Sequence, residues 1–267
     1  HSGDAVLRGK RQRGNGRLML LFLCDLDNTL IFSHRHRKPG DVCVEWLDGR
    51  EQSFMTANVW ENLGRLENVR LIPVTTRSVE QYRRIQWPKA PEWAAAANGG
   101  ILLGPCGMDP AWLEASRKLA EPYQDDLART EAALSSEAWC LRRKMVDGLY
   151  LFAVSENQET AETGANNFQA GPLTVSVSGR KVYFFPPGLH KGAAAAVLRE
   201  RFGPCRMVCA GDSSLDLPML ALADIALTPS TELARQCGEN ARVCPESRRF
   251  SDFVLEEVLR ARAFSEI

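Results

Sequence analysis

The stretch LMLLFLCDLDNT, residues 18–29, decides the fold prediction. Its apolar part, residues 18–24, has the length and composition of a buried strand in a parallel sheet. Asp25 and Asp27 follow two residues apart, so their side chains lie on the same side of an extended chain. The carboxyl end of a parallel strand is where α/β proteins place ligands. Two carboxylates this close favour either a bound cation or one raised pKa, and Asn28 and Thr29 suit the turn that leaves the strand.

Composition narrows the class of protein. The chain has 267 residues, 45% hydrophobic content and a formal net charge of zero. This length supports one large domain or two moderate ones, and the charge balance argues against nucleic acid or a membrane surface as the main partner. A small anionic substrate needs only a local positive pocket, so the charge balance does not exclude one. The sequence contains no pattern that predicts an oligomeric state.

The eight cysteines contain no C-x-x-C pair. Cys205 and Cys209 are four residues apart, but Cys209 falls in a strand-like apolar run, which disfavours zinc binding. We therefore expect reduced thiols in a cytoplasmic protein. Residues 1–16 are polar, glycine-rich and basic, and we expect a flexible basic tail. No apolar stretch approaches the roughly 18 residues that span a bilayer.

Two separated stretches of chain alternate between strand and helix patterns. Residues 17–80 and 186–267 together predict a discontinuous α/β core with a Rossmann-like, doubly wound parallel sheet. Residues 81–185 differ: a helix pattern over 110–133 precedes the order strand, strand, helix, strand, strand. This order predicts an inserted α+β domain, which suits a cap that opens and closes over a core site.

Two further features leave alternatives open. Residues 42–55 predict a hairpin with its turn at Asp48-Gly49, which fits either a flap over the site or a plain structural hairpin. Strand alternation in the insert places Arg142 and Lys144 on one face. These cations either contact an anionic or sugar substrate or belong to a solvated sheet face.

Four elements at the ends of core strands or the start of a core helix carry chemistry: Asp25 with Asp27, Thr75, Lys191, and the run from Gly211-Asp212 to Asp216. Phosphoryl transfer needs charge neutralisation, positioning and a protonated leaving group. One carboxylate can attack phosphorus while another group transfers protons. Mg²⁺ prefers oxygen ligands and needs only one or two carboxylates. A lysine and a hydroxyl can hold phosphoryl oxygens. The four elements therefore contain the chemical groups that a phosphatase needs.

The chain resembles the haloacid dehalogenase-like (HAD) superfamily of phosphatases over roughly residues 18–265. The resemblance rests on D-x-D-x-T at Asp25, the Thr75 and Lys191 motifs, and G-D-x-x-x-D at Gly211. The insert between the Thr and Lys motifs is similar to the α+β cap of the Cof-type and sucrose-phosphate-phosphatase-like branch. The resemblance implies a Mg²⁺-dependent phosphomonoesterase that works through an aspartyl-phosphate on a small soluble ester, such as a sugar phosphate.

The resemblance also implies roles for individual residues. Asp25 would be the nucleophile and a magnesium ligand, and Asp27 the general acid/base, with its backbone carbonyl on the metal. Thr75 would hydrogen-bond the phosphoryl group, although Thr76 could face the site instead. Lys191 would neutralise charge on the nucleophile and the phosphoryl oxygens.

The remaining implied roles concern the metal and the substrate. Asp212 would bind magnesium, and Asp216 would bind it through water or orient Lys191. Asn98-Gly99 matches a cap-junction motif near the substrate. The predicted substrate-binding residues are therefore Thr76, Arg77, Asn98, Gly99, Arg142 and Lys144.

Two positions depart from the branch pattern. Thr76 stands where the branch has Gly, which restricts the turn after the strand, and Leu215 stands where it often has Asn. Neither change removes a charged catalytic group. Two other functions stay open: a phosphomutase or phosphotransferase of the same chemistry, and a non-catalytic protein that binds a phosphate ligand.

Overall fold

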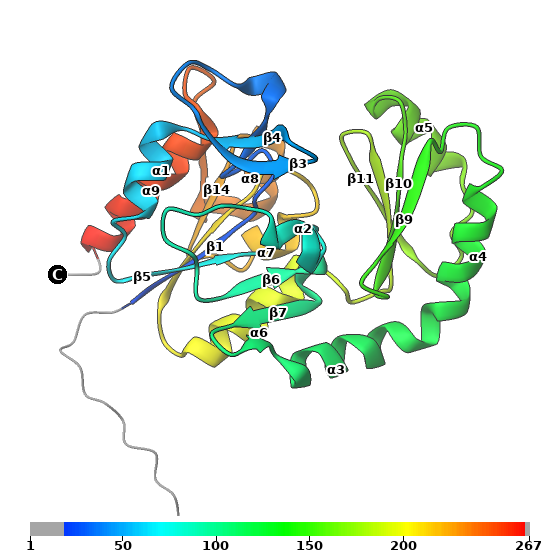
Figure 1. Ribbon diagram of the computed structural model, residues 1–267. Coiled ribbons are helices and arrows are strands. Elements are labelled where there is room, and N and C mark those ends of the chain that lie inside the picture. The colour runs from blue at the N-terminus through cyan, green and yellow to red at the C-terminus, as the bar shows by residue number, and fades with distance from the viewer. Residues whose placement is uncertain (1–18, 265–267) are drawn as a thin grey trace, which may run out of the picture.

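The computed structural model describes residues 19–264, so the predicted tail at residues 1–16 lies outside the described residues. Five parallel strands form the central sheet in the order β15-β14-β13-β1-β5 (Figure 1). Their bounds are β1 Leu20–Cys24, β5 Val69–Pro73, β13 Arg206–Ala210, β14 Ile225–Thr228 and β15 Ala241–Val243. This arrangement confirms the predicted Rossmann-like fold class. No helix within residues 19–264 is long and apolar enough to cross a bilayer.

Strand β1 lies inside the sheet, between β13 and β5, and both of its faces are apolar. Leu20 and Phe22 pack into one layer, and Leu21 and Leu23 into the other. Two helices cover the first face, α1 Ala57–Leu63 and α9 Phe250–Phe264. Three helices cover the second, α6 Lys191–Phe202, α7 Leu217–Leu220 and α8 Thr231–Cys237. The sheet is therefore doubly wound, and Asp25 emerges from its buried middle.

The predicted hairpin forms close to the carboxyl ends of the core strands. It consists of β3 Val42–Leu47 and β4 Arg50–Met55, and β2 Phe32–Ser33 adds to β4. Asp48 and Gly49 both have positive φ, which a two-residue turn between twisted strands requires. The hairpin projects beside the gap between the core and the second sheet (Figure 1).

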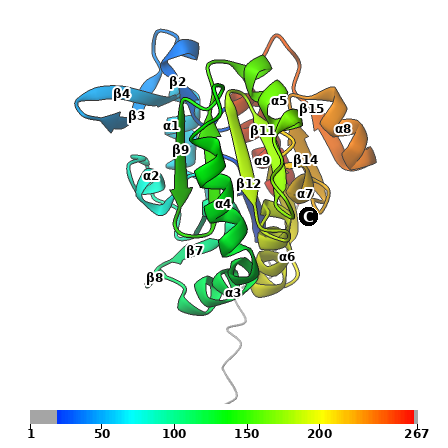
Figure 2. The same ribbon diagram turned by 90° about the vertical axis from the view of Figure 1, so that its right-hand side faces the viewer.

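A second, four-stranded antiparallel sheet stands beside the core, in the order β11-β12-β10-β9. Its strands are β9 Arg142–Val146, β10 Tyr150–Val154, β11 Thr174–Ser178 and β12 Lys181–Phe185. The helices α4 Gln124–Leu134 and α5 Gln158–Asn167 cover the face that points away from the core (Figure 2). The opposite face carries Tyr150, Phe152 and Tyr183 and packs towards the core. The predicted order of strands and helix in the insert is confirmed.

The segment that joins the two sheets differs from its prediction. The expected single helix over 110–133 is divided into α3 Pro110–Ala120 and α4, with a short 3-10 turn between them. Pro122 lies in that turn, where its missing N–H and its ring interrupt the helical hydrogen bonds. Helix α3 runs from the core to the cap sheet (Figure 1).

Residues 94–108 pack with the core. Strand β6 Ala94–Ala96 pairs with β7 Ile101–Gly104, and β7 pairs with β8 Gly107–Met108. Ala95 also bridges to Val74, just beyond β5. Upstream, α2 Val79–Arg83 starts from a capping box at Ser78. The division at residue 80 stays a prediction, and this packing favours a cap that starts later, near Asp109.

The start of helix α6 depends on an unusual cap. The Nδ1 atom of His190 accepts a hydrogen bond from the backbone N–H of Ala193 at 3.1 Å. Burial lowers the pKa of His190, so the ring is neutral and able to accept this bond at about pH 8.

We expect His190→Ala to lower the free energy of unfolding by about 1 kcal/mol, because a first-turn N–H loses its partner. His190→Asn keeps a capping acceptor and is expected to stay close to wild type. Urea denaturation at about pH 8 compares the three proteins. Equal losses in both variants would contradict the cap assignment.

Candidate active site

Asp25 follows β1 at the carboxyl edge of the sheet, between β13 and β5. Its backbone N–H donates to the carbonyl of Ala210 on β13 at 2.9 Å. Its Oδ1 accepts a hydrogen bond from Nζ of Lys191 at 2.5 Å, and its Oδ2 accepts one from Oγ1 of Thr29 at 3.4 Å. Asp25 and Lys191 are both buried. The carboxylate is therefore held in one orientation by groups from two distant parts of the chain.

Lys191 links Asp25 to Asp216. Its Nζ also donates to Oδ1 of Asp216 at 2.6 Å, so one ammonium bridges two buried carboxylates. The backbone at Lys191 can lie close to Pro218 because the next residue is Gly192. A β-carbon at residue 192 would lie 2.5 Å from the carbonyl oxygen of Pro218. Burial alone would lower the pKa of Lys191, but the two carboxylates outweigh it and raise that pKa.

The loop after β13 closes around Asp216. The Oδ2 atom of Asp216 accepts hydrogen bonds from the backbone N–H groups of Asp212 and Ser213 and from Oγ of Ser213, at 3.0–3.1 Å. Gly211 is needed for this closure, since a β-carbon there would lie 2.3 Å from Cβ of Asp216. Both oxygens of Asp216 already have donors. Of its two predicted roles, the contacts favour the orientation of Lys191.

Asp25, Asp212 and Asp216 form an acidic cluster, with carboxylate oxygens within 4.8 Å of one another. Lys191 compensates only one of these three negative charges. Burial raises the pKa of Asp25 well above its ordinary range; Lys191 opposes the rise, and Asp216 and Asp212 add to it. Burial, followed by the charge of Asp216, raises the pKa of Asp212 to about 7. Uncompensated carboxylate oxygens of this kind fit a hard divalent cation such as Mg²⁺.

The raised pKa of Asp212 gives a testable pH dependence. Between its ordinary value of 3.8 and about 7, the metal-free folded protein binds a proton that the unfolded chain does not. The free energy of unfolding without metal should therefore fall as the pH rises through this window. Mg²⁺ must displace the same proton, so its apparent affinity should rise with pH up to at least about pH 7, by about tenfold per pH unit for each proton that is displaced.

Calorimetric titration of Mg²⁺ at several values between about pH 5.5 and pH 8.5 measures this trend. Asp212→Asn is the matched variant, in which both the affinity and its pH dependence should be largely lost. A wild-type affinity that does not change with pH would show that no proton is displaced.

Asp27 points away from this cluster. Its carboxylate is half exposed, at 49%, and accepts two hydrogen bonds of 2.8 Å from Nε and Nη2 of Arg77. Burial would raise the pKa of Asp27, but Arg77 outweighs it and holds the pKa below its ordinary value, with a further contribution from Lys181. Asp27 is thus ionised in this arrangement. Its predicted metal contact through the backbone carbonyl stays a prediction.

Arg77 is itself held by the hairpin. Its Nη1 lies 2.9 Å from Oε1 of Glu45, a buried residue of β3. Glu45 also pairs with Arg84 at 3.1 Å and accepts a hydrogen bond from Oγ of Ser53 at 2.6 Å. The hairpin is therefore joined to the Thr motif by buried charges, which gives it a place at the site.

Thr75 and Thr76 lie at the end of β5 but differ in surroundings. Thr75 is fully buried, and its Oγ1 accepts a hydrogen bond from the backbone N–H of Arg77 at 3.1 Å. Thr76 lines the cleft described below, and its carbonyl accepts a hydrogen bond from the hydroxyl of Tyr150 in the cap sheet. The choice between them as the phosphoryl contact stays a prediction.

Asn98 and Gly99 join the core to the segment before Lys191. Asn98 adopts positive φ, its N–H donates to the carbonyl of Thr75 at 2.8 Å, and its Nδ2 donates to the carbonyl of Leu189 at 3.2 Å. Its Oδ1 is buried with no hydrogen-bond partner among residues 19–264. The carbonyl of Gly99 accepts from the indole of Trp112 at 2.9 Å. Both residues are buried at this junction, and their predicted contact with substrate is untested.

A cleft of about 240 Å³ lies between the core, the hairpin and the cap sheet. Asp27, Arg77 and Thr76 line its core side, whereas Phe152, Lys181 and Tyr183 line its cap side. Arg142 and Lys144 are exposed on the edge strand β9. In the sheet register Lys144 is paired with Phe152, and Arg142 with Val154, so both cations are on the face that looks towards the cleft.

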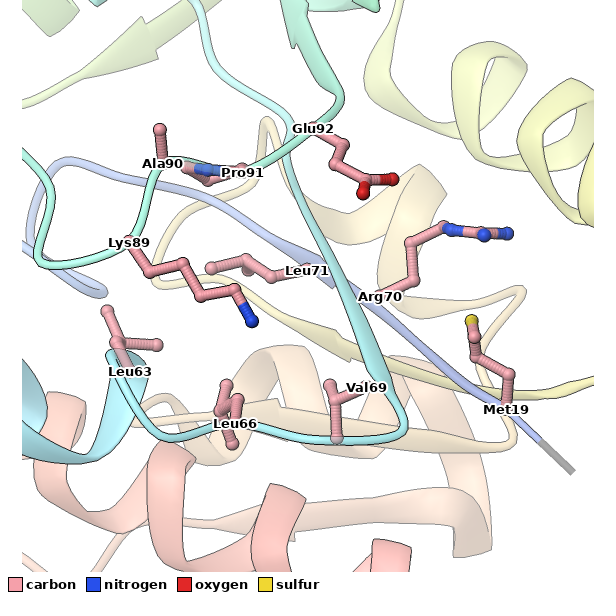
Figure 3. Close-up of a pocket in the computed structure, with 10 residues that line it drawn as sticks. All are labelled: Met19, Leu63, Leu66, Val69, Arg70, Leu71, Lys89, Ala90, Pro91 and Glu92. Atoms are coloured by element: carbon pink, nitrogen blue, oxygen red, sulfur yellow. The ribbon is translucent and has the colours of Figure 1, made fainter. Parts of the chain in front are cut away.

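Another cavity, of about 200 Å³, lies elsewhere (Figure 3). It is lined by Met19 and Val69, at the amino ends of β1 and β5, and by the segment Lys89–Glu92. Asp25 is at the opposite, carboxyl end of β1. Because α/β sheets bind ligands at carboxyl ends, we assign the site to the cleft and not to this cavity.

Among the residues of this region that sequence reasoning left out of the site, four are closest to its predicted residues or its cleft. Thr29 contacts Asp25, Glu45 holds Arg77, Tyr150 contacts Thr76, and Lys181 enters the cleft. Thr29 has a signal, because it belongs to the D-x-D-x-T motif. The others depend on how the hairpin and the insert are placed against the core.

No protein-family model matches this chain, and no curated protein sequence matches it significantly. Among solved structures, it is similar to the sucrose-phosphatase of Synechocystis sp. PCC6803 in complex with sucrose and phosphate, at 18% identity and a TM-score of 0.63, over 93% of this chain and 98% of that one. It is also similar to a HAD subclass IIB sugar phosphatase, at 10% identity and a TM-score of 0.58, over 91% and 98% of the two chains. A protein related to trehalose-6-phosphate phosphatase matches at 13% identity and a TM-score of 0.54, over 92% and 97%. The chain therefore has the fold of HAD phosphatases, inserted cap included.

Proposed function

We propose that this protein is a HAD superfamily phosphatase that hydrolyses a small phosphate monoester, such as a sugar phosphate, with Mg²⁺. The observation that carries the proposal is the buried line from Asp25 through Lys191 to Asp216, with Asp212 beside it. It combines a fixed carboxylate, a compensating ammonium and an acidic cluster at the carboxyl edge of the sheet. The likeness in fold to three sugar phosphatases or their relatives supports the same assignment.

The proposed reaction has two steps. First, a carboxylate oxygen of Asp25 attacks phosphorus, the ester P–O bond breaks, and the leaving oxygen takes a proton from Asp27. Second, Asp27 takes a proton from water, whose oxygen attacks the aspartyl-phosphate and releases inorganic phosphate and free Asp25. Mg²⁺, held by Asp25 and Asp212, would neutralise charge on the phosphoryl oxygens. In the first step Lys191 holds Asp25 in one orientation and opposes the rise of its pKa, which favours the ionised nucleophile.

Asp27 must gain a proton before it can act as an acid. Its pairing with Arg77 favours the ionised form, which suits the second step. An anionic substrate in the cleft would compete for Arg77 and weaken that pairing. We therefore propose that Arg77 exchanges Asp27 for the substrate, so that Asp27 is free to carry the proton.

The test is phosphate release from p-nitrophenyl phosphate and a panel of sugar phosphates, with Mg²⁺ or with EDTA. We expect release that requires Mg²⁺ and that is faster on at least one sugar phosphate than on the aryl ester. Metal-independent release, or none from any ester, would overturn the proposal.

A further inference from the structure

Three cations lie on the face of the cap sheet that looks towards the cleft. Lys181 on β12 is paired in register with Val154 on β10, which is paired with Arg142 on β9. Lys144 is two residues from Arg142 along β9 and is paired in register with Phe152. Since neighbouring strands are about 4.8 Å apart, Lys181 and Arg142 are about 10 Å apart at the backbone. Their long side chains can therefore reach a common point over the sheet.

These cations form no ion pair within the described part of the chain, and Lys181 acts on Asp27 only through its longer-range charge. Among residues 19–264, none of the three is within ion-pair distance of a carboxylate, as the described ion pairs show. The Nζ atom of Lys181 instead lies 5.4 Å from the ring centroid of Phe152, at the wall of the cleft. A cation on an aromatic ring is positioned while its charge stays available.

On the core side of the cleft, in contrast, the cations are paired with carboxylates. Arg77 is paired with Asp27 and Glu45, Arg84 with Glu45, and the buried Lys191 near them with Asp25 and Asp216. Positive charge that is not already compensated is thus concentrated on the cap side, away from the carboxylate that attacks phosphorus. A leaving group that extends from phosphorus towards the cap meets this charge.

The surface beneath Lys181 is apolar. Phe152 and Tyr183 are both largely buried, and their ring centroids are 6.0 Å apart. Two aromatic rings side by side suit a carbon chain or a sugar ring, which they cover without competing for its polar groups. The cap side of the cleft therefore combines the exposed edges of two aromatic side chains with cations at its margin.

We infer that the substrate's leaving group carries an anionic substituent of its own, a carboxylate or a second phosphate, which Lys181 binds together with Arg142 or Lys144. The protein would then act on phosphorylated sugar acids or sugar bisphosphates in preference to neutral sugar phosphates. This inference rests on the proposed function for the position of the reacting phosphate.

The test measures binding without turnover, in the Asp25→Asn protein with Mg²⁺, by calorimetric titration. One pair of ligands is 6-phosphogluconate and glucitol 6-phosphate, which differ only in a carboxylate against a hydroxymethyl group. The other is glucose 1,6-bisphosphate and glucose 6-phosphate. We expect the more anionic member of at least one pair to bind about tenfold more tightly, which is about 1.4 kcal/mol. The pair that responds distinguishes a carboxylate from a phosphate.

Variants assign this preference to the cap. In the Asp25→Asn background, Lys181→Gln should reduce the preference to threefold or less, and Lys181→Arg should keep it. Arg143→Gln is the matched control, because Arg143 is on the same edge strand but is paired with Ala153 on the opposite face. It removes the same charge from the sheet and should leave the preference unchanged.

Equal affinities within both pairs, or a preference that survives Lys181→Gln, would overturn the inference. Wild-type turnover separates it from the proposed function. Phosphatase activity without an anionic preference overturns only the inference. A binding preference that depends on Lys181, in a wild-type protein that releases no phosphate, supports the inference and overturns only the proposed function.

Discussion

Asp25→Asn is expected to lower kcat for phosphate release on the order of 10⁵-fold, the scale seen when an enzyme loses its nucleophile. The substituted amide has the same shape as the carboxylate but cannot form the aspartyl-phosphate. Lys191 keeps its contact with Asp216, so the fold should persist. Single-turnover assays with p-nitrophenyl phosphate and Mg²⁺ measure the loss.

A matched control separates chemistry from stability. Asp224 is an acid of the core that pairs with Arg199 and accepts a hydrogen bond from the backbone N–H of Met207, away from the acidic cluster. Asp224→Asn should lower stability while leaving kcat within about twofold of wild type. If Asp25→Asn retained more than about 1% of wild-type kcat, Asp25 would not be the nucleophile.

Lys191→Met has the second largest expected effect, and this effect is on stability. Without the ammonium, Asp25 and Asp216 are left as buried carboxylates with no counter-charge. Breaking a buried pair from one side typically costs about 3–5 kcal/mol, and we expect a loss of that size in the free energy of unfolding. Phosphate release should disappear as well.

The loss should grow with pH. Lys191 is protonated in both the folded and the unfolded state below its ordinary pKa, so its own titration contributes nothing between about pH 5 and pH 8. In the variant, the pKa of Asp25 rises further, and its folded state binds protons that the unfolded chain releases. Its stability therefore falls as the pH rises through that interval. Urea denaturation in EDTA at about pH 5.5 and pH 8 measures the difference.

A double-mutant cycle identifies the pair responsible. Adding Asp216→Asn to Lys191→Met removes one of the stranded charges, so the double variant should be more stable than the sum of the single losses predicts, by about 1–3 kcal/mol. Additive losses at both pH values would show that Lys191 and Asp216 are not coupled energetically.

The core of the site could be predicted from the sequence because its residues follow buried strands. Asp25 comes after β1 and Gly211 after β13, and the carboxyl ends of adjacent parallel strands meet at one edge. Strands β1 and β13 were visible as apolar runs, and β5 was visible despite Arg70. Strand β6 was not visible in the sequence, because its three alanines have little β-propensity. These alanines form a strand because an apolar edge is available beyond β5.

The cap side of the site could not be predicted in the same way. Tyr150 reaches Thr76, and Lys181 reaches the cleft, only because the insert packs one particular face of its sheet against the core. Alternation along β9 and β12 separates two faces but does not say which one looks inwards. The pairing of Glu45 with Arg77 likewise depends on where the hairpin folds back. The break at Pro122, by contrast, was readable from the proline alone.

The two halves of the cleft come from separate parts of the gene. Asp25, Lys191 and Asp216 all belong to the doubly wound sheet and its helices, whereas Phe152, Lys181 and Tyr183 belong to the insert. No residue of the insert takes part in these buried ion pairs, so we expect mutations in the insert to leave them unchanged. Sequence change in the insert can therefore alter what the cleft accepts, while the buried charges that would carry the proposed chemistry stay in place.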